Sequence, residues 1–358
     1  MTDFTPALAA AFAFQSRACR YFGSDLTANL IDAIAEEARE QGALAALMAP
    51  FAALDEQGAA QAAVAIRFAG FAHASVLQGL APDLACFYPP VAQPFEPLAV
   101  RAALARLARA EKMRFAHFLT SPPQTNEVGR SLALIGGFAT IAAETGLPLR
   151  TFEIGASAGL NMNWDLYRYD VGMQGAFGDA ASPVQIHGDW SGPLPPFAKL
   201  NGPLKAIEKR GCDISPINAL DPEQALRLRA YCWADQARRV DALSAALELA
   251  KTYPPKVDMA DAGQWVEEVV YPVAGSVSVL YHSIMWQYMP EPTQARIRSH
   301  MERVGAQATA EAPMAWLRLE PPSDVKQMPQ VSLQSWPSGA ERKLADAHPH
   351  GAMVVWAP

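Results

Sequence analysis

The sequence has little charge and few cysteines, and these shortages exclude several classes of protein. Only 18% of the 358 residues are charged and 51% are hydrophobic, which excludes an intrinsically disordered chain. No run rich in Lys or Arg occurs, and the net charge of −7 offers no general attraction to phosphate backbones or anionic lipid. We therefore expect a small-molecule partner and neither nucleic acid nor membrane, while the oligomeric state stays open.

The cysteines and histidines show no metal-binding spacing. Cys19, Cys86, Cys212 and Cys232 are scattered and form no CxxC pair, so we expect reduced thiols, as in a cytoplasmic protein. His348-Pro349-His350 has no carboxylate or cysteine at a fixed distance, which favours a turn over a metal site. The N-terminus lacks the basic start of a signal peptide, and no apolar run reaches the roughly 18 residues of a membrane span.

Residues 1–120 predict a helical bundle or cap domain. Ala and Leu dominate, and apolar residues recur at steps of three and four positions between Gly and Pro breaks. No run in this part has the pattern of a β-strand. The expected helices cover residues 6–21, 26–40, 59–80 and 98–119.

Residues 121–358 predict an α/β domain. A helix over residues 127–145, with Asn126 as its N-cap, precedes short apolar runs that alternate with helical segments. This alternation is typical of a parallel sheet with crossover helices. A β-hairpin insertion is expected near residues 165–190, where it would either shape the pocket or block it.

The strongest motif is a strand followed by a turn of small residues. Residues 149–154 form a candidate strand that leads into Gly155-Ala156-Ser157-Ala158-Gly159 and then Leu160-Asn161. Glycine permits a tight turn and a close approach of backbone to ligand, and the next helix offers unpaired N–H groups. The GxxxG spacing, with Glu153 two residues ahead, suits a nucleoside cofactor that has a cationic amine and no phosphates. The alternative is a tight strand–helix turn with a structural glutamate.

The following segments resemble class I S-adenosylmethionine-dependent methyltransferases. Gly211-Cys212-Asp213-Ile214-Ser215-Pro216 is similar to the second strand of that family, and residues 256–262 are similar to its third strand and loop. The resemblance implies a Rossmann-like sheet of seven strands, mostly parallel, with an antiparallel last pair at residues 331–336 and 352–356. The cofactor residues that it implies are Glu153, Gly155, Ala156, Ser157, Gly159, Asn161, Asp213, Ile214, Asp261, Ala262 and His282.

Individual roles also follow from this resemblance. It implies that Asp213 accepts hydrogen bonds from the ribose hydroxyls and that Asp261 contacts the adenine amino group. His282, at the end of a fourth strand over residues 276–283, would face the transferred methyl and act as a catalytic base, or merely cap the strand. Glu127 and Arg130, three residues apart, would hold a polar substrate or form an ion pair within the helix.

The whole chain also resembles a bacterial family of uncharacterised proteins, which implies a fold and not a reaction. The stretches that carry this resemblance are Gln124-Thr125-Asn126-Glu127-Val128-Gly129-Arg130, Glu153 to Asn161, Tyr167-Arg168-Tyr169-Asp170 and His348-Pro349-His350-Gly351.

Two alternatives to a methyltransferase stay open. Gly155-Ala156-Ser157-Ala158-Gly159 is also the G-x-S-x-G pattern of a serine hydrolase, with Asp261 and His348 in the matching order downstream. Against it, no oxyanion segment of the HGGG type precedes the motif. The second alternative is a Rossmann-like binding module without catalytic activity.

Overall fold

The computed structural model describes residues 3–200, 202–323 and 327–357, and the chain divides into two compact units. Unit 1 comprises Met1–Thr125 and Pro222–Val240, and unit 2 comprises Asn126–Asp221 and Asp241–Pro358. The sequence-based boundary at residue 120 lies close to the first crossing between the units. The sequence-based division did not predict that residues 222–240 belong to unit 1.

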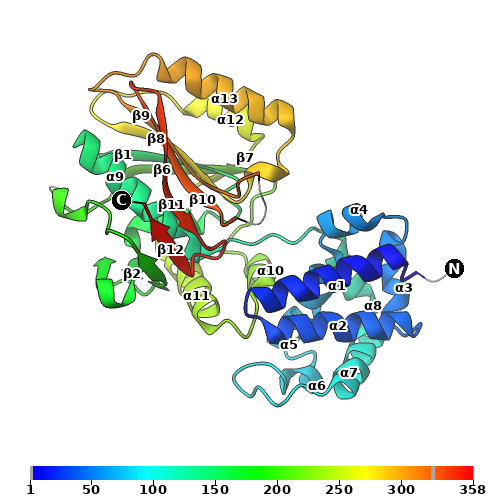
Figure 1. Cartoon of the computed structure of the whole chain (residues 1–358). Helices are drawn as coiled ribbons and strands as arrows, with labels where there is room; N and C mark the ends of the chain where they lie inside the picture. Colours follow the sequence, from blue (N-terminus) through cyan, green and yellow to red (C-terminus); the bar gives the residue numbers. More distant parts are fainter. Residues whose placement is uncertain (1–2, 201, 324–326, 358) are drawn as a thin grey trace. The chain divides into compact units, whose positions relative to one another are not determined.

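Unit 1 is built from helices, and its described residues contain no strand (Figure 1). Its helices are α1 (Pro6–Tyr21), α2 (Asp25–Arg39), α3 (Ala45–Met48), η1 (Ala49–Phe51), α4 (Glu56–Gln61), α5 (Val64–Leu77), α6 (Pro82–Ala85), α7 (Pro97–Ala110), α8 (Lys112–Thr120) and α10 (Pro222–Tyr231). Helix α11 (Ala237–Thr252) begins in this unit and continues into unit 2. Helix α1 begins where Thr5 caps it: the Thr5 hydroxyl accepts a hydrogen bond from Leu8 N at 3.3 Å.

Two helices expected from the sequence are each divided in the structure. The helix expected over residues 59–80 is split into α4 and α5 at Ala63, whose φ of 48° is left-handed. The helix expected over residues 98–119 is split into α7 and α8 at Glu111. Segment Glu56–Leu77 is long and apolar enough to cross a membrane, with a mean hydropathy of 1.2. However, 61% of its most apolar window is buried inside the protein, so the core of unit 1 accounts for its composition.

The core of unit 1 depends on aromatic contacts between helices that are distant in sequence. Phe71 of α5 stacks on Phe115 of α8 at 4.0 Å between ring centres. Tyr231 of α10 lies so close to Gly70 that a β-carbon there would stand 2.5 Å from the tyrosine ring. Burying one such large side chain stabilises the fold by about 1.5–3 kcal/mol. The packing of Tyr231 on α5 therefore explains why α10 belongs to unit 1.

Unit 2 contains a nine-stranded sheet in the order β5-β12-β11-β10-β9-β8-β1-β6-β7. Its strands are β1 (Leu149–Ile154), β5 (Asp189–Ser191), β6 (Ala206–Asp213), β7 (Val257–Met259), β8 (Val277–Ser283), β9 (Met314–Glu320), β10 (Gln330–Trp336), β11 (Ala340–Ala347) and β12 (Met353–Trp356). The five strands β7, β6, β1, β8 and β9 are parallel to one another. Strands β10, β11 and β12 form an antiparallel meander, and β5 adds parallel to β12.

This sheet corrects the expectation of seven strands. The strands expected at residues 331–336 and 352–356 correspond to β10 and β12, but they do not pair, because β11 lies between them. The first half of β11 is exposed and charged, so its sequence lacks the alternation that identified the other strands. What holds is a mixed α/β unit with a large sheet of parallel and antiparallel strands.

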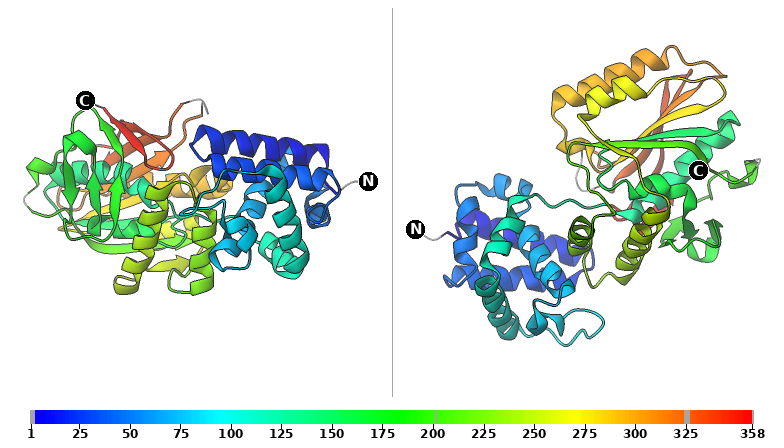
Figure 2. Two further views of the ribbon diagram at one scale, coloured as in Figure 1. Left: turned by 90° about the horizontal axis from the view of Figure 1, so that it is seen from below. Right: turned by 180° about the vertical axis from the view of Figure 1, so that it is seen from behind.

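Helices cover both faces of the sheet in unit 2 (Figures 1 and 2). Helices α12 (Ala262–Val269) and α13 (Glu291–Gly305) pack on one face, where Phe152 and Ile154 of β1 join their core. Helix α9 (Ser131–Thr145) lies on the other face, where its Phe138 contacts Tyr281 edge-on at 5.2 Å. Because side chains alternate along a strand, Glu153 points to the α9 face while its neighbours point to the α12 and α13 face.

A smaller sheet follows β1 in the chain. Strands β2 (Arg168–Asp170) and β3 (Ala176–Gly178) form the hairpin in the segment where an insertion was expected, and β4 (Gln185–His187) pairs parallel with β2. The remaining short 3-10 helices are η2 (Val128–Arg130), η3 (Leu160–Leu166), η4 (Gly172–Gln174), η5 (Phe197–Lys199) and η6 (Trp286–Tyr288).

Candidate functional site

The carboxyl ends of the parallel strands bring most of the expected site residues to one edge of the sheet. Strand β1 ends at Ile154, and it lies between β6, which ends at Asp213, and β8, which ends at Ser283. Open parallel sheets bind ligands at this edge, where the loops after neighbouring strands separate.

The glycine turn after β1 has the left-handed backbone that its sequence predicts. Gly155, Ser157 and Gly159 have φ values of 64°, 55° and 69°. The space in front of Gly155 is filled by Met285, since a β-carbon on Gly155 would stand 2.6 Å from Met285 Cε. A β-carbon on Gly159 would stand 2.7 Å from Met162, Pro255 and Val257. Packing within the protein therefore requires both glycines, and a ligand at Gly155 would have to displace the Met285 side chain.

Asp213 fixes this turn to the end of β6. One carboxylate oxygen accepts a hydrogen bond from Ser157 N and the other from Ser215 N, both at 2.9 Å. The next residue, Ile214, is 79% exposed, and Met259 at the end of neighbouring β7 is 76% exposed. Two large apolar side chains thus face solvent beside the turn, where a flat apolar ligand could lie against them.

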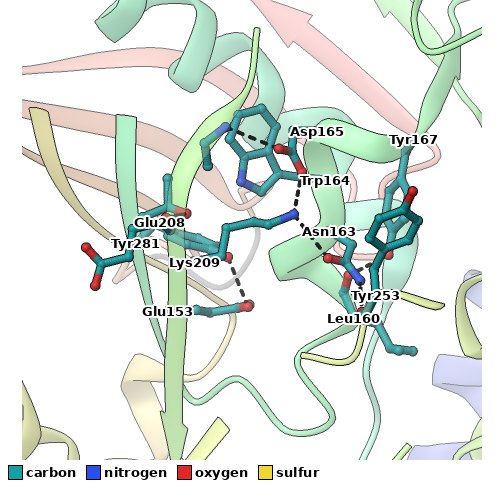
Figure 3. Close-up of polar contacts among 12 residues, drawn as sticks. Glu153, Leu160, Asn163, Trp164, Asp165, Tyr167, Glu208, Lys209, Tyr253 and Tyr281 are labelled. Atoms are coloured by element: carbon teal, nitrogen blue, oxygen red, sulfur yellow. Dashed lines mark hydrogen bonds and ion pairs between the residues drawn. The ribbon is translucent and has the colours of Figure 1, made fainter. Parts of the chain in front are cut away.

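Glu153 is buried on the α9 face and is hydrogen-bonded to Tyr281, whose hydroxyl donates to Glu153 Oε2 at 3.1 Å (Figure 3). Burial raises the pKa of Glu153 to about 8, although the Tyr281 hydrogen bond and the charge of Arg130 oppose this rise. At pH 7 the side chain is therefore mainly a neutral acid. A neutral acid offers no counter-charge to an amine, which was the role expected for Glu153.

Residues 126–130 contact the end of the turn and lead through η2 into α9. Asn126 accepts a hydrogen bond from Leu160 N at 2.8 Å, and Asn161 Nδ2 donates to Glu127 O at 3.1 Å. The helix expected over residues 127–145 is present as η2 followed by α9, which ends at Thr145, but Asn126 does not cap it as expected. Glu127 has a non-helical backbone, so it does not share a helix face with Arg130 as expected.

Arg130 holds the ends of two segments together. Its guanidinium donates to Ser283 O at 3.1 Å and to Pro349 O at 3.0 Å. These bonds join the end of β8 to the loop before β12. The cation also lies close enough to Glu153 to lower the pKa of that side chain. Arg130 therefore contributes positive charge to the same edge of the sheet.

His282 lies on the opposite face of the sheet from Glu153 and is fully buried. Its Nδ1 lies 2.6 Å from Glu320 Oε1, while Nε2 has no hydrogen-bond partner among the described residues. The ring stacks on Trp286 at 5.0 Å between ring centres. A carboxylate on one ring nitrogen and an unpaired second nitrogen is the arrangement of a general base, but here Trp286 covers it.

Two residues of the alternative serine-hydrolase triad, Ser157 and Asp261, form no hydrogen bond to a histidine among the described residues. Ser157 Oγ is buried and has no partner among the described residues. Asp261 caps α12 by accepting from Gln264 N at 3.0 Å and also accepts from Thr293 Oγ1 at 3.4 Å. Asp261 is therefore a helix-capping residue, and its neighbour Ala262 is the first residue of α12.

Comparison with known proteins identifies a family without a described activity. A family model described as "Uncharacterized protein conserved in bacteria (DUF2332)" matches residues 9–356. The chain belongs to the DUF2332 family. No curated protein and no solved structure matches the chain.

Several residues at this edge of the DUF2332 chain were missed by sequence reasoning. Tyr281, Met285 and Glu320 contact the expected site residues from β8, its following loop and β9. Lys209 of β6 forms a further polar group with Asp165 and Asn163 at 2.9 and 3.2 Å (Figure 3). Tyr281 lies within the strand expected over residues 276–283, but nothing in the sequence pairs it with Glu153.

Proposed function

We propose that unit 2 binds S-adenosylmethionine at the carboxyl ends of β1, β6 and β7 and transfers its methyl group to a small molecule. The observation that carries this proposal is the pair of exposed apolar side chains, Ile214 and Met259, beside the left-handed turn. Such side chains suit the flat faces of an adenine ring, and the parallel order of β7, β6, β1, β8 and β9 suits a nucleoside-binding sheet of the methyltransferase type.

The nucleoside end of the cofactor fits the described residues. Asp213 is already oriented at the turn by the N–H groups of Ser157 and Ser215, so its carboxylate needs little reordering to meet ribose hydroxyls. Ile214 would lie against one face of the adenine. Asp261 and Ala262, at the start of α12, would lie near its edge, as the resemblance to methyltransferases implies.

The amino-acid end of the cofactor requires a rearrangement. Met285 covers Gly155, and Glu153 is buried and neutral at pH 7, so neither offers a preformed site for the charged groups. Met285 is an unbranched side chain with three rotatable bonds, and its movement away from Gly155 is a small change. The arrangement therefore supports a cofactor that enters together with a movement of the loop after β8.

In this proposal the protein supplies position and a proton acceptor. The bound sulfonium supplies an activated methyl group, so the protein needs no covalent step of its own. Exclusion of water and alignment of the substrate with the methyl carbon provide most of the rate enhancement. His282 would accept the substrate's proton, while Glu127 and Arg130 would hold a polar substrate, as expected from the sequence.

Isothermal titration calorimetry with S-adenosylmethionine and S-adenosylhomocysteine tests this function. Both ligands should bind the wild-type protein, and Ile214→Glu should weaken binding at least tenfold because it puts a charge against the adenine face. Ile207→Glu is the matched control: Ile207 is an exposed residue near the start of β6, the strand that Ile214 follows, and its change should alter affinity less than twofold. Equal effects of the two changes, or no binding to the wild type, would contradict the proposal.

Two other experimental outcomes would replace the methyltransferase proposal with a different function. The left-handed backbone and unpaired hydroxyl of Ser157 favour a serine hydrolase in second place. Labelling of Ser157 by a fluorophosphonate probe, lost in Ser157→Ala, would establish that alternative. Cofactor binding without methyl transfer to any metabolite in a panel would instead establish a binding module.

A further inference from the structure

The loop after β8 covers two functional groups at once. Its residue Met285 packs against Gly155 in the turn after β1, and its residue Trp286 stacks on His282. Ile284, where the loop leaves the strand, has a left-handed φ of 48°, which is uncommon for a β-branched residue. We define residues 284–289 as the cover loop.

One side chain holds both the histidine and the cover loop. Glu320, at the end of β9, accepts hydrogen bonds from Met285 N at 3.1 Å and from Trp286 N at 3.4 Å. The same carboxylate lies 2.6 Å from His282 Nδ1. Three donors from a neighbouring strand and its loop therefore converge on a single carboxylate.

These contacts determine which nitrogen of His282 carries the proton. An ionised carboxylate only accepts hydrogen bonds, so Nδ1 carries hydrogen and Nε2 keeps its lone pair. Nε2 is buried without a partner among the described residues, which leaves it available to a group that enters when the loop moves.

We propose that Glu320 is a positioning residue: it fixes His282 with Nε2 as the proton acceptor and holds the cover loop closed over both His282 and Gly155. Displacement of Met285 and Trp286 then exposes the base and the cofactor turn in one movement. This role deepens the proposed function and rests on it for the identity of the reaction.

In the proposed methyl transfer, every proton and electron pair has a donor and an acceptor. A substrate O–H or N–H gives its proton to Nε2, and the electron pair left on the substrate forms the bond to the methyl carbon. The electrons of the broken sulfur–methyl bond stay on sulfur. Glu320 stabilises the resulting imidazolium. The other charged groups near this face are Arg298, whose guanidinium lies 5.1 Å from the Trp286 ring, and Arg318, which lies 4.6 Å from the Trp316 ring.

Nuclear magnetic resonance of the whole protein tests the positioning role without measuring activity. Long-range 15N–1H correlation at fixed pH should show the Nδ1–H tautomer of His282 in the wild type. Glu320→Leu should shift the tautomer ratio at least tenfold toward Nε2–H and accelerate amide exchange at Met285 and Trp286 at least tenfold. Glu320→Gln keeps one acceptor oxygen, so it should preserve the tautomer and still accelerate exchange. Glu302→Gln, at an exposed position of α13, is the control and should change neither.

Addition of S-adenosylhomocysteine separates the two ideas. In the wild type it should change amide exchange at Met285, because the ligand replaces that side chain at Gly155. If the ligand does not bind, the proposed function fails, while the tautomer measurement still decides the role of Glu320. If the ligand binds but His282 keeps its Nδ1–H tautomer and Met285 its slow exchange in both Glu320 variants, the positioning role fails and the function survives.

Discussion

Two glutamates near the carboxyl ends of β1 and β9 show how the two faces of one sheet place the same side chain in different surroundings. On the α9 face Glu153 accepts a hydrogen bond from one described residue, Tyr281, and complete burial raises its pKa to about 8. On the α12 and α13 face Glu320 is 15% exposed and accepts from His282 and two backbone N–H groups. Burial thus keeps Glu153 mainly a neutral acid at pH 7, whereas the donors around Glu320 let one side chain hold both a histidine and a loop.

The largest expected effect is on the pH dependence of stability at Glu153. Its folded pKa of about 8 lies above the ordinary 4.5, so the stability from the protonated acid is complete below pH 4.5 and is lost as pH rises toward 8. Glu153→Gln lacks this loss. The difference in unfolding free energy between the two proteins should therefore change by roughly 4–5 kcal/mol, in favour of the variant, between pH 4.5 and 8. Urea denaturation across this range measures it, and parallel pH curves would contradict the neutral state of Glu153.

The next effect concerns the donors on Glu320. Glu320→Leu leaves His282 Nδ1 and the N–H groups of Met285 and Trp286 without their acceptor, which should cost about 3 kcal/mol of unfolding free energy. Glu302→Gln should stay within about 0.5 kcal/mol of the wild type. Urea denaturation at pH 7 compares the three proteins. If Glu320→Leu lowers the unfolding free energy by less than about 1 kcal/mol, Glu320 differs less from Glu153 than the number of hydrogen-bond donors around it indicates.

The smallest effect concerns the single donor on Glu153. Tyr281→Phe removes the hydroxyl that favours the ionised form, so the pKa of Glu153 should rise further and stability should fall by about 1 kcal/mol. The pH titration used for Glu153→Gln, repeated in the Tyr281→Phe background, measures both changes. A fall in the pKa of Glu153 would show that another group, and not Tyr281, governs this face.

The strands that the sequence predicts well are the buried ones. Strand β8 is buried at every position, and its β-branched and apolar residues identify it without any knowledge of its partners. The left-handed turn after β1 is equally local, because glycines at a strand end predict it. Strand β11 escaped prediction because its first half is exposed, and β5 because it has only three residues.

The contacts of the site depend on residues that are far apart in sequence, and pattern alone cannot pair them. Glu320 lies 38 residues from His282, and Asn126 lies 34 residues from the backbone N–H that it binds. A residue such as Asn126 is a reasonable helix cap from its local sequence, and only the fold shows that it caps a different segment. The position of Met285 over Gly155 has no sequence signal, since methionine in a loop is compatible with exposure or burial.

The return of Pro222–Val240 to unit 1 has a consequence for synthesis of the chain. Tyr231 and Ala230 belong to the core of the first helices, and His73 Nδ1 lies 3.1 Å from Ala230 O. When only the first 125 residues have emerged from the ribosome, the apolar surface of unit 1 that packs against Tyr231 is therefore exposed. The segment that covers this surface is encoded about a hundred codons later. Until that later segment emerges, the nascent helices are incompletely packed or bound by chaperones.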